Sequence, residues 1–242
     1  MEDNSNNMLD IQQVEEIRVS ALTDEKRVAF YRKTYTHLAL AVLMFIAVES
    51  IFFQIPALVE LALSLTVGWR WLIMLGIFMF ATNYAEKMAL SSTDKNRQYL
   101  ALLLFVIAEA FIFIPLILIA MSISGEQSFG ILTQAAIITL SLFLGLSAVV
   151  LLTKKDFSFL KSALTIGFFI ALGLIVVGVI GGFNLGLWFS VGMVALAAGT
   201  ILYQTSKMAN KYNEDQYVAA SLGLFASLML LFWYVLSILS RD

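Results

Sequence analysis

The sequence predicts an all-α, polytopic membrane protein: seven transmembrane helices in a compact bundle, with the N-terminus inside and the C-terminus outside. The first observation is composition, since 60% of the 242 residues are hydrophobic and only 13% are charged, whereas soluble domains carry about 25% charged residues. The second is seven apolar runs, each near the roughly 20 residues that a helix needs to cross a bilayer. These runs lack the alternation of barrel strands, so helices are the spanning elements. The third is the distribution of basic residues.

The expected spans are, in chain order, Leu38–Ile55, Val67–Ala85, Tyr99–Met121, Ile131–Leu152, Ser162–Ile180, Leu185–Tyr203 and Tyr217–Leu239. Before them, residues 1–27 form a polar tail that we expect to be cytoplasmic and disordered. Residues 28–242 then form the seven-helix transmembrane domain. The apolar segment Ala57–Thr66 is too short to cross the bilayer, so we expect it to lie at the interface or to re-enter the membrane after Pro56.

Basic residues alternate between the two sides of this arrangement. Only Arg70 and Arg241 lie on the side of the C-terminus. The other 13 of the 15 Lys and Arg residues fall in the tail and in the second, fourth and sixth loops: Arg18, Lys26, Arg27, Arg32, Lys33, Lys87, Lys95, Arg97, Lys154, Lys155, Lys161, Lys207 and Lys211. Lys and Arg are enriched in cytoplasmic loops, so the N-terminus is expected inside. A missed or an extra span would scramble this alternation.

Residues that the chain lacks argue against several kinds of chemistry. There is no cysteine, which excludes disulfides, thiolate metal sites and cysteine catalysis. With His37 as the single histidine, a conventional zinc site is not expected. No HExxH motif and no glycine-rich phosphate loop occurs. We therefore expect no enzyme activity, no cofactor and no nucleic-acid partner. The lipid bilayer is the expected surrounding, and for a bacterial chain it is the inner membrane.

Several short segments together resemble one known family. They are Arg32-Lys33-Thr34-Tyr35, Ala108-Glu109-Ala110, Gln134, Gly145-Leu146-Ser147, the loop Thr153–Leu160 and Ile201-Leu202-Tyr203. In their order and spacing, from about residue 28 to the end, these segments are similar to those of the Bax-inhibitor family, the transmembrane Bax inhibitor motif proteins.

The resemblance implies a compact seven-helix bundle with the last helix near the centre. Members of this family are linked to calcium leak across membranes and to the control of cell death or stress, and bacterial relatives are linked to a membrane-anchored protease. In calcium-leaking members, two aspartates from the last two helices form a pH-sensitive pair that closes the pore. Such a pair shares a proton, because both carboxyls cannot ionise cheaply in a low dielectric.

This chain departs from the family at both acids. The family's Ile-Leu-Tyr-Asp ends here in Gln204, and its Ser-Leu-Tyr-Leu-Asp reads Ser-Leu-Gly-Leu-Phe over Ser221–Phe225. Relatives with the pair can also carry an arginine near the inner end of span two, where this chain has Asn83–Lys87. Without the two aspartates, a buried arginine would be unpaired and costly, so the absence of the arginine agrees with the absence of the two acids. Gln204 can hydrogen-bond but cannot titrate, which argues against the di-aspartate gate.

Two acids remain inside the expected spans as candidates for an ion pathway, beside Gln204. Glu109 lies roughly 15 Å along span three, and an acid at such depth faces the bundle interior or water and often marks an ion path. Its alternative role is that of a protonated or hydrogen-bonded structural residue. Glu49, in the outer half of span one, either lines a cavity or is a neutral or snorkelling acid. If Glu49 and Glu109 converge, they would replace the lost pair as a cation or proton site.

Two residues are candidates for pH sensing, Glu109 and His37. Histidine titrates close to physiological pH. His37 lies at the inner interface beside Tyr35, where a solvated interfacial role is the alternative.

Two functions follow as hypotheses. The first is a passive pathway for Ca²⁺ or other cations that lacks the di-aspartate pH gate. The second is a non-transporting regulator of stress or cell death that binds a membrane-anchored protease or another membrane protein. Intramembrane hydrolysis lacks a paired-acid or Ser/His signature.

Overall fold

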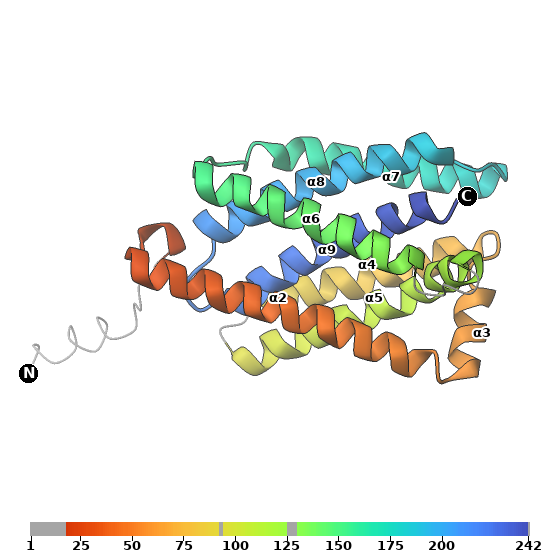
Figure 1. Ribbon diagram of the computed structural model, residues 1–242, viewed down its shortest axis with the longest axis horizontal. Helices are drawn as coiled ribbons and strands as arrows, with labels where there is room; N and C mark the ends of the chain where they lie inside the picture. The colour runs from red at the N-terminus through yellow and green to blue at the C-terminus, as the bar shows by residue number, and fades with distance from the viewer. Residues whose placement is uncertain (1–17, 92–93, 125–129, 242) are drawn as a thin grey trace, which may run out of the picture.

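The computed structural model describes residues 18–91, 94–124 and 130–241. Within these ranges the chain is helical, apart from an isolated β-bridge between Arg18 and Asn213. The helices (Figure 1) are the short 3-10 helix η1 Val19–Ala21 and the α-helices α2 Asp24–Phe52, α3 Pro56–Ser64, α4 Arg70–Ser91, α5 Lys95–Ser124, α6 Gly130–Thr153, α7 Leu160–Gly181, α8 Gly186–Asn210 and α9 Tyr217–Leu239. The all-α class that the sequence predicts is confirmed.

Six of the described helices are long and apolar enough to cross a membrane: α2, α5, α6, α7, α8 and α9. The chain is therefore an integral, multi-pass membrane protein. The other long helix, α4, has 22 residues, but its last part carries Asn83, Glu86 and Lys87. It contains most of the expected span Val67–Ala85 and continues beyond it to Ser91.

The last helix, α9, lies in the middle of the bundle, as the family resemblance implies. It packs against α2, α4, α5, α6 and α8, and in Figure 1 it runs between α5 and α8. In both α9 and α5, 61% of the most apolar segment is buried inside the protein, whereas for α7 the share is 11%. The core is therefore built around α5 and α9, and α7 presents most of its apolar surface to lipid.

The first long helix, α2, begins at Asp24, well before the expected start of span one at Leu38. Its buried residues explain the extension, because they recur every three or four positions and form one stripe along the helix: Phe30, Thr34, Leu38, Ala41, Phe45 and Glu49. The polar segment Arg32–His37 is therefore helical because one side of it packs against the bundle.

The described part of the tail before the boundary expected at residue 27 contacts the helical bundle, and the boundary itself stays a prediction. Val19 is fully buried, and its backbone N–H donates to the Tyr212 carbonyl over 2.9 Å. The Arg27 guanidinium donates to the carbonyls of Ser20 and Leu22. Residues 18–27 thus contact the loop between α8 and α9, through Val19, Arg18 and Lys26. Residues 1–17 lie outside the described residues.

The segment after Pro56 forms the nine-residue helix α3. Pro56 occupies its first turn. Proline is favoured there, because backbone N–H groups in the first turn have no acceptor within the helix and proline has no N–H to leave unpaired. The helix packs against α5 and α2. At this length α3 cannot span a bilayer, as the sequence indicates.

Candidate functional site

Aromatic side chains from α2, α5 and α9 meet in the centre of the bundle. This aromatic cluster consists of Phe45, Phe105, Phe113, Phe225, Phe232 and Trp233. The Phe113 ring lies 5.3 Å from Phe45, 5.6 Å from Phe232 and 4.9 Å from Trp233, between ring centroids. Phe225 lies 6.5 Å from Phe45 and 6.1 Å from Phe105. Most of these pairs meet edge to face, a favourable geometry for aromatic rings.

Phe225 occupies the position at which the family resemblance places the second aspartate. Its side chain is fully buried and packs edge to face against Phe45 and Phe105. An aromatic ring therefore occupies the place at the centre of the bundle where the resemblance puts the family's carboxyl. The aromatic cluster is not among the features expected from the sequence. The sequence does contain one indication of it. Phe105 lies one turn before Glu109 and Phe113 one turn after it, so all three share one face of α5.

Glu109 lies in the interior of the bundle, between the turns of α5 that carry Phe105 and Phe113. Only 6% of its surface is exposed. Among the described residues, the ion pairs involve other acids, namely Asp24, Glu86, Glu214 and Asp215. Glu109 is thus a buried acid without a cationic partner in the part of the chain that the structure describes.

Glu49 and Glu109 belong to different surroundings. Glu49 is among the residues that line a cavity, whereas Glu109 is not. Glu109 lies on α5 between the turns of Phe105 and Phe113, and Glu49 lies one turn beyond Phe45 on α2. A joint cation or proton site formed by the two acids stays a prediction.

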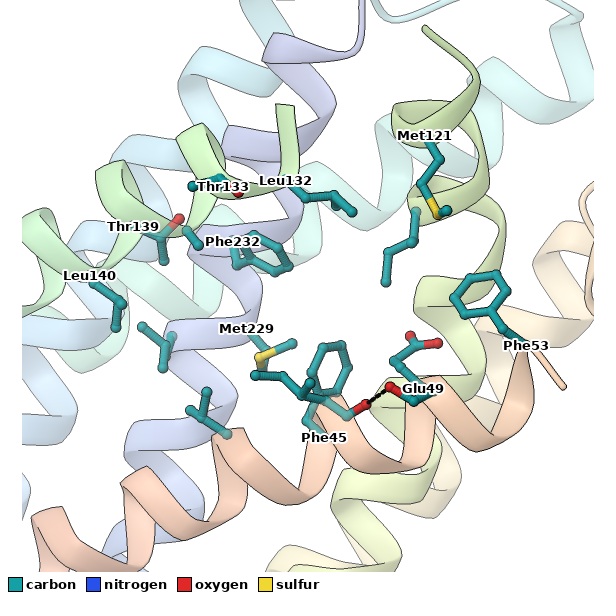
Figure 2. A pocket seen from close by; sticks show the side chains of 16 residues that line it. Phe45, Glu49, Phe53, Met121, Leu132, Thr133, Thr139, Leu140, Met229 and Phe232 are labelled. Atoms are coloured by element: carbon teal, nitrogen blue, oxygen red, sulfur yellow. Dashed lines mark hydrogen bonds between the residues drawn. The ribbon is translucent and has the colours of Figure 1, made fainter. Parts of the chain in front are cut away.

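Glu49 instead lines a cavity of about 530 Å³ between α2, α5, α6 and α9. Figure 2 shows its carboxyl group pointing into this space. Glu49 is 6% exposed, and neither carboxyl oxygen has a hydrogen-bond partner among the described residues. The cavity-lining interpretation of Glu49 is the one that the geometry favours.

Gln204, which replaces the family's first aspartate, lies on α8 opposite Gly223 of α9. Its side-chain oxygen Oε1 is buried and has no hydrogen-bond partner among the described residues. A Cβ atom at position 223 would lie 2.9 Å from this oxygen and 3.5 Å from the Tyr212 hydroxyl. The amide of Gln204 thus uses the space that a side chain at position 223 would need. The family's Asp and Tyr at these two positions are replaced together, by a longer and a smaller residue.

A pair of opposite charges lies near the C-terminal end of α4. Glu86 of α4 and Lys207 of α8 approach to 4.0 Å, and the Lys207 ammonium lies 5.1 Å from the Tyr212 ring centre. Burial, together with the nearby Glu86 carboxylate, raises the pKa of Tyr212 above its usual range. The acid here is on α4 and the cation on α8, so the arginine that relatives can carry near this end has no counterpart.

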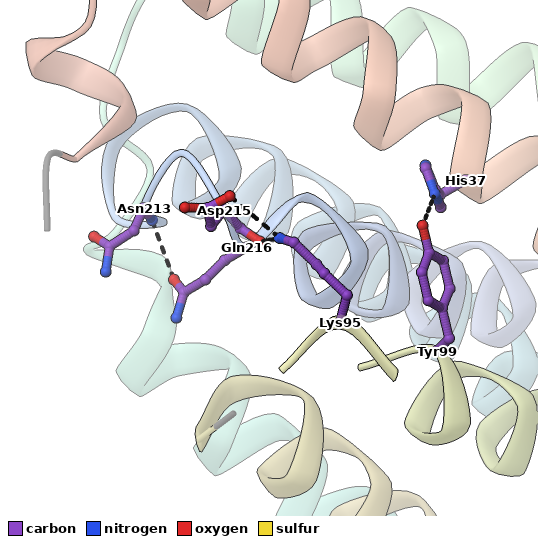
Figure 3. Close-up of polar contacts among 6 residues, drawn as sticks. All are labelled: His37, Lys95, Tyr99, Asn213, Asp215 and Gln216. Atoms are coloured by element: carbon purple, nitrogen blue, oxygen red, sulfur yellow. Dashed lines mark hydrogen bonds and ion pairs between the residues drawn. The ribbon is translucent and has the colours of Figure 1, made fainter. Parts of the chain in front are cut away.

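His37 belongs to a polar contact region between α2, α5 and α9 (Figure 3). Its Nδ1 lies 2.7 Å from the Lys33 carbonyl and its Nε2 lies 3.0 Å from the Tyr99 hydroxyl. A carbonyl can only accept, so Nδ1 carries a proton, and in the neutral ring Nε2 accepts from Tyr99. The ring also lies 5.0 Å from Tyr217, over which Lys95 places its ammonium at 4.3 Å. His37 is therefore packed against two tyrosines, and its role in pH sensing stays a prediction.

Ser206 of α8 forms two hydrogen bonds to the loop between α6 and α7. The Ser206 hydroxyl donates to the Asp156 carboxylate over 2.9 Å and accepts from the Phe157 backbone N–H over 2.9 Å. Asp156 also accepts from the Ser158 N–H over 2.8 Å. These hydrogen bonds, those from Ser158 first and that from Ser206 after them, lower the pKa of Asp156.

Replacing Ser206 by Ala is expected to lower the free energy of unfolding by about 1–2 kcal/mol, because the Phe157 N–H loses its acceptor. Thermal unfolding in detergent measures the loss. A lowered carboxyl pKa stabilises the folded state above the unfolded pKa, near 4, and this contribution disappears as the pH falls. The variant should therefore lose less stability than the wild type between pH 6 and pH 3. Ser221→Ala is the control, since the Ser221 hydroxyl donates only to a carbonyl of its own helix.

A family model described as "Inhibitor of apoptosis-promoting Bax1" matches residues 27–242 of the chain. The match covers the whole described helical bundle from early α2 to its C-terminal end. The three elements of the candidate site, namely the aromatic cluster, Glu109 and the Glu49 cavity, all lie within it.

Individual relatives come from bacteria, mammals and viruses. An uncharacterized protein of Pseudomonas aeruginosa is 40% identical over 111 residues, which cover 45% of this chain and 49% of that protein. Mouse protein lifeguard 4 is 28% identical over 220 residues, 88% of this chain and 85% of its own length. The Golgi anti-apoptotic protein of vaccinia virus is 31% identical over 114 residues, 45% of this chain and 46% of its own. The chain spans about half the length of the bacterial and viral relatives named here.

Proposed function

Because this chain belongs to the family of inhibitors of apoptosis-promoting Bax1, we propose that it is a non-transporting regulator of stress or cell death and not an enzyme. It acts by binding a membrane-anchored protease or another membrane protein. The relatives include a viral protein named as anti-apoptotic. The observation that carries the proposal is the aromatic cluster, which fills the centre of the bundle at the position of the family's second aspartate.

The proposed arrangement in the membrane has seven spans, with α4 as the seventh beside the six apolar helices. It places the N-terminus inside and the C-terminus outside. Two observations support it: the alternation of the basic residues along the chain, and the packing of α4 against α5 and α9 in the same bundle. The membrane is the inner one if the chain is bacterial, as several relatives are.

The proposal is tested by reconstituting the full chain with a membrane-anchored protease from the same membrane. We expect the two to co-purify at a fixed ratio and the rate of proteolysis to fall when the chain is present. The control is the same protease with a bundle protein of unrelated sequence at equal density. An unchanged rate of proteolysis and no complex, in well-folded protein, would contradict the proposal.

One observation favours a second candidate, a cation leak without the di-aspartate gate. Glu109 is a buried acid beside the aromatic cluster, and acids at such depth often mark an ion path. Ca²⁺ would be the transported ion, with Gln204 further along the path. Calcium prefers six or more oxygen ligands, and no cluster of three acidic or histidine side chains forms among the described residues. A pathway past Glu109 would therefore bind Ca²⁺ weakly, and Glu109→Gln would abolish the flux.

A further inference from the structure

The cavity at Glu49 opens sideways, through the flank of the bundle between α2 and α6. Its lining comes from α2, α5, α6 and α9. Lining residues on the two facing helices are exposed at its edge, Ile46 of α2 by 54% and Leu140 of α6 by 45%. In the proposed arrangement this flank faces lipid. A molecule dissolved in the membrane could therefore enter the cavity without crossing a loop.

Two residues that line this cavity carry polar groups without a hydrogen-bond partner among the described residues. The Glu49 carboxyl is the first, with both oxygens buried and lacking a hydrogen bond among the described residues. The Thr139 hydroxyl, on the opposite wall in α6, is the second, and Thr139 is only 2% exposed. An unmade hydrogen bond of a buried polar group is costly, and a buried acid in a membrane helix is more costly still. Both costs fall if a ligand supplies the missing partners.

The remaining wall defines the chemistry of such a ligand. It is built mainly from apolar side chains, among them Phe45, Phe53, Met121 and Phe232 (Figure 2). Glu49 is the single ionisable residue among those that line the cavity. A metal ion would need several oxygen ligands around it, which one carboxyl does not provide. An organic cation with an apolar body matches both the charge and the wall.

The shape of the cavity gives the orientation of the ligand. On α2 the lining runs from Val42 to Ser50, with Phe53 just after the helix, and on α6 from Leu132 to Leu140, so the cavity extends along the helices for about 12 Å. Glu49 lies one turn before the end of α2 at Phe52. The carboxyl is therefore near the end of the bundle, close to the depth of a membrane surface, and the apolar part reaches toward the membrane centre.

We propose that this cavity binds a single-chain amphiphile with a protonated amine, with the ammonium group on the Glu49 carboxylate and the chain along Thr139 and Leu140. An ammonium–carboxylate hydrogen bond in such an apolar site is of the strong, charge-assisted kind. The volume of about 530 Å³ is within the roughly 300–1,000 Å³ of typical ligand sites. This site is distinct from the leak candidate at Glu109, because Glu109 is not among the residues that line the cavity.

The test measures binding of radiolabelled dodecylamine to the full chain in phosphatidylcholine nanodiscs, with empty nanodiscs as background and dodecanol as the uncharged probe. Glu49→Gln removes the charge and keeps the shape. Glu60→Gln is the matched control, since Glu60 is an exposed acid on α3. Leu140→Trp fills the deep part of the cavity and tests its apolar half independently of Glu49. Size-exclusion profiles confirm that each variant is folded.

We expect saturable binding of dodecylamine that weakens by about tenfold or more in Glu49→Gln and is unchanged in Glu60→Gln. Dodecanol binding should be insensitive to Glu49→Gln, and Leu140→Trp should weaken both probes. Equal dodecylamine binding by Glu49→Gln and wild type, or no saturable binding above empty nanodiscs, overturns the proposal. Adding lysophosphatidylethanolamine, a single-chain lipid that carries an amine, to the nanodiscs identifies the source: if it displaces dodecylamine, a membrane lipid supplies the amine, and if it does not, a free single-chain amine does.

Discussion

Replacing Phe225 by Asp is expected to prevent stable folding of the bundle. Phe225 is fully buried between Phe45 and Phe105. Losing a buried aromatic ring costs about 3–5 kcal/mol, and a buried carboxyl without a partner adds about 1–3 kcal/mol or more. This sum is comparable with the whole stability of a typical protein, about 5–15 kcal/mol. The measurement is the monodisperse fraction of purified protein after mild heating in detergent.

Phe225→Leu is the matched control, because it keeps an apolar side chain of similar volume and should cost less than about 1.5 kcal/mol. The comparison of the two variants separates the loss of aromatic contacts from the burial of an acid. If Phe225→Asp were as stable as Phe225→Leu, position 225 would accept the family's carboxyl. The aromatic cluster would then not be what fills the centre of the bundle.

Replacing Phe113 by Ala is expected to lower the free energy of unfolding by about 3 kcal/mol or more. Phe113 is 1% exposed and contacts Phe45, Phe232 and Trp233. Packing contacts, more than exclusion from water, hold helices together in a membrane. The variant leaves a cavity between three helices, because these rings cannot all move into it. Reversible unfolding in mixed detergent measures the change.

Phe169→Ala on α7 serves as the control for Phe113→Ala. It removes the same ring from a side chain that is 67% exposed, so it leaves no internal cavity and should change stability by less than about 0.5 kcal/mol. Equal losses for the two variants would show that the cost follows from the residue type and not from the cluster.

The fold class and the order of the helices could be predicted from the sequence. Hydropathy and the placement of basic residues are patterns that extend over whole helices and loops, so they can be read without knowing which helices pack together. The start of α2 could not be predicted. Residues Arg32–His37 read as polar, and the stripe through Phe30 and Thr34 that packs them against the bundle becomes evident only with its partners α5 and α9. In α4, the helix continues past the expected end of the span at Ala85. The contact of Glu86 with Lys207 of α8 could not be predicted, because the two residues are distant in the sequence.

The candidate site could be predicted in part. The burial of Glu109 follows from its depth in an apolar run, and the replacements at Gln204 and Phe225 follow from the family resemblance. The compensation between Gln204 and Gly223 depends on the distance between two helices, which one sequence does not contain. The same is true of Glu49: its position along α2 indicates burial, but the cavity that it lines is formed jointly with α5, α6 and α9, which are distant in the sequence.

The measurement that tests the central claim most directly is calcium flux through the purified chain in liposomes at pH 6 and pH 8. Protein-free liposomes set the background, an ionophore sets the maximum, and Glu109→Gln is measured beside the wild type. A bundle closed by the aromatic cluster predicts flux at the protein-free level at both pH values for both proteins. Flux that depends on protein density and disappears in Glu109→Gln would contradict the account and make Glu109 part of a cation pathway.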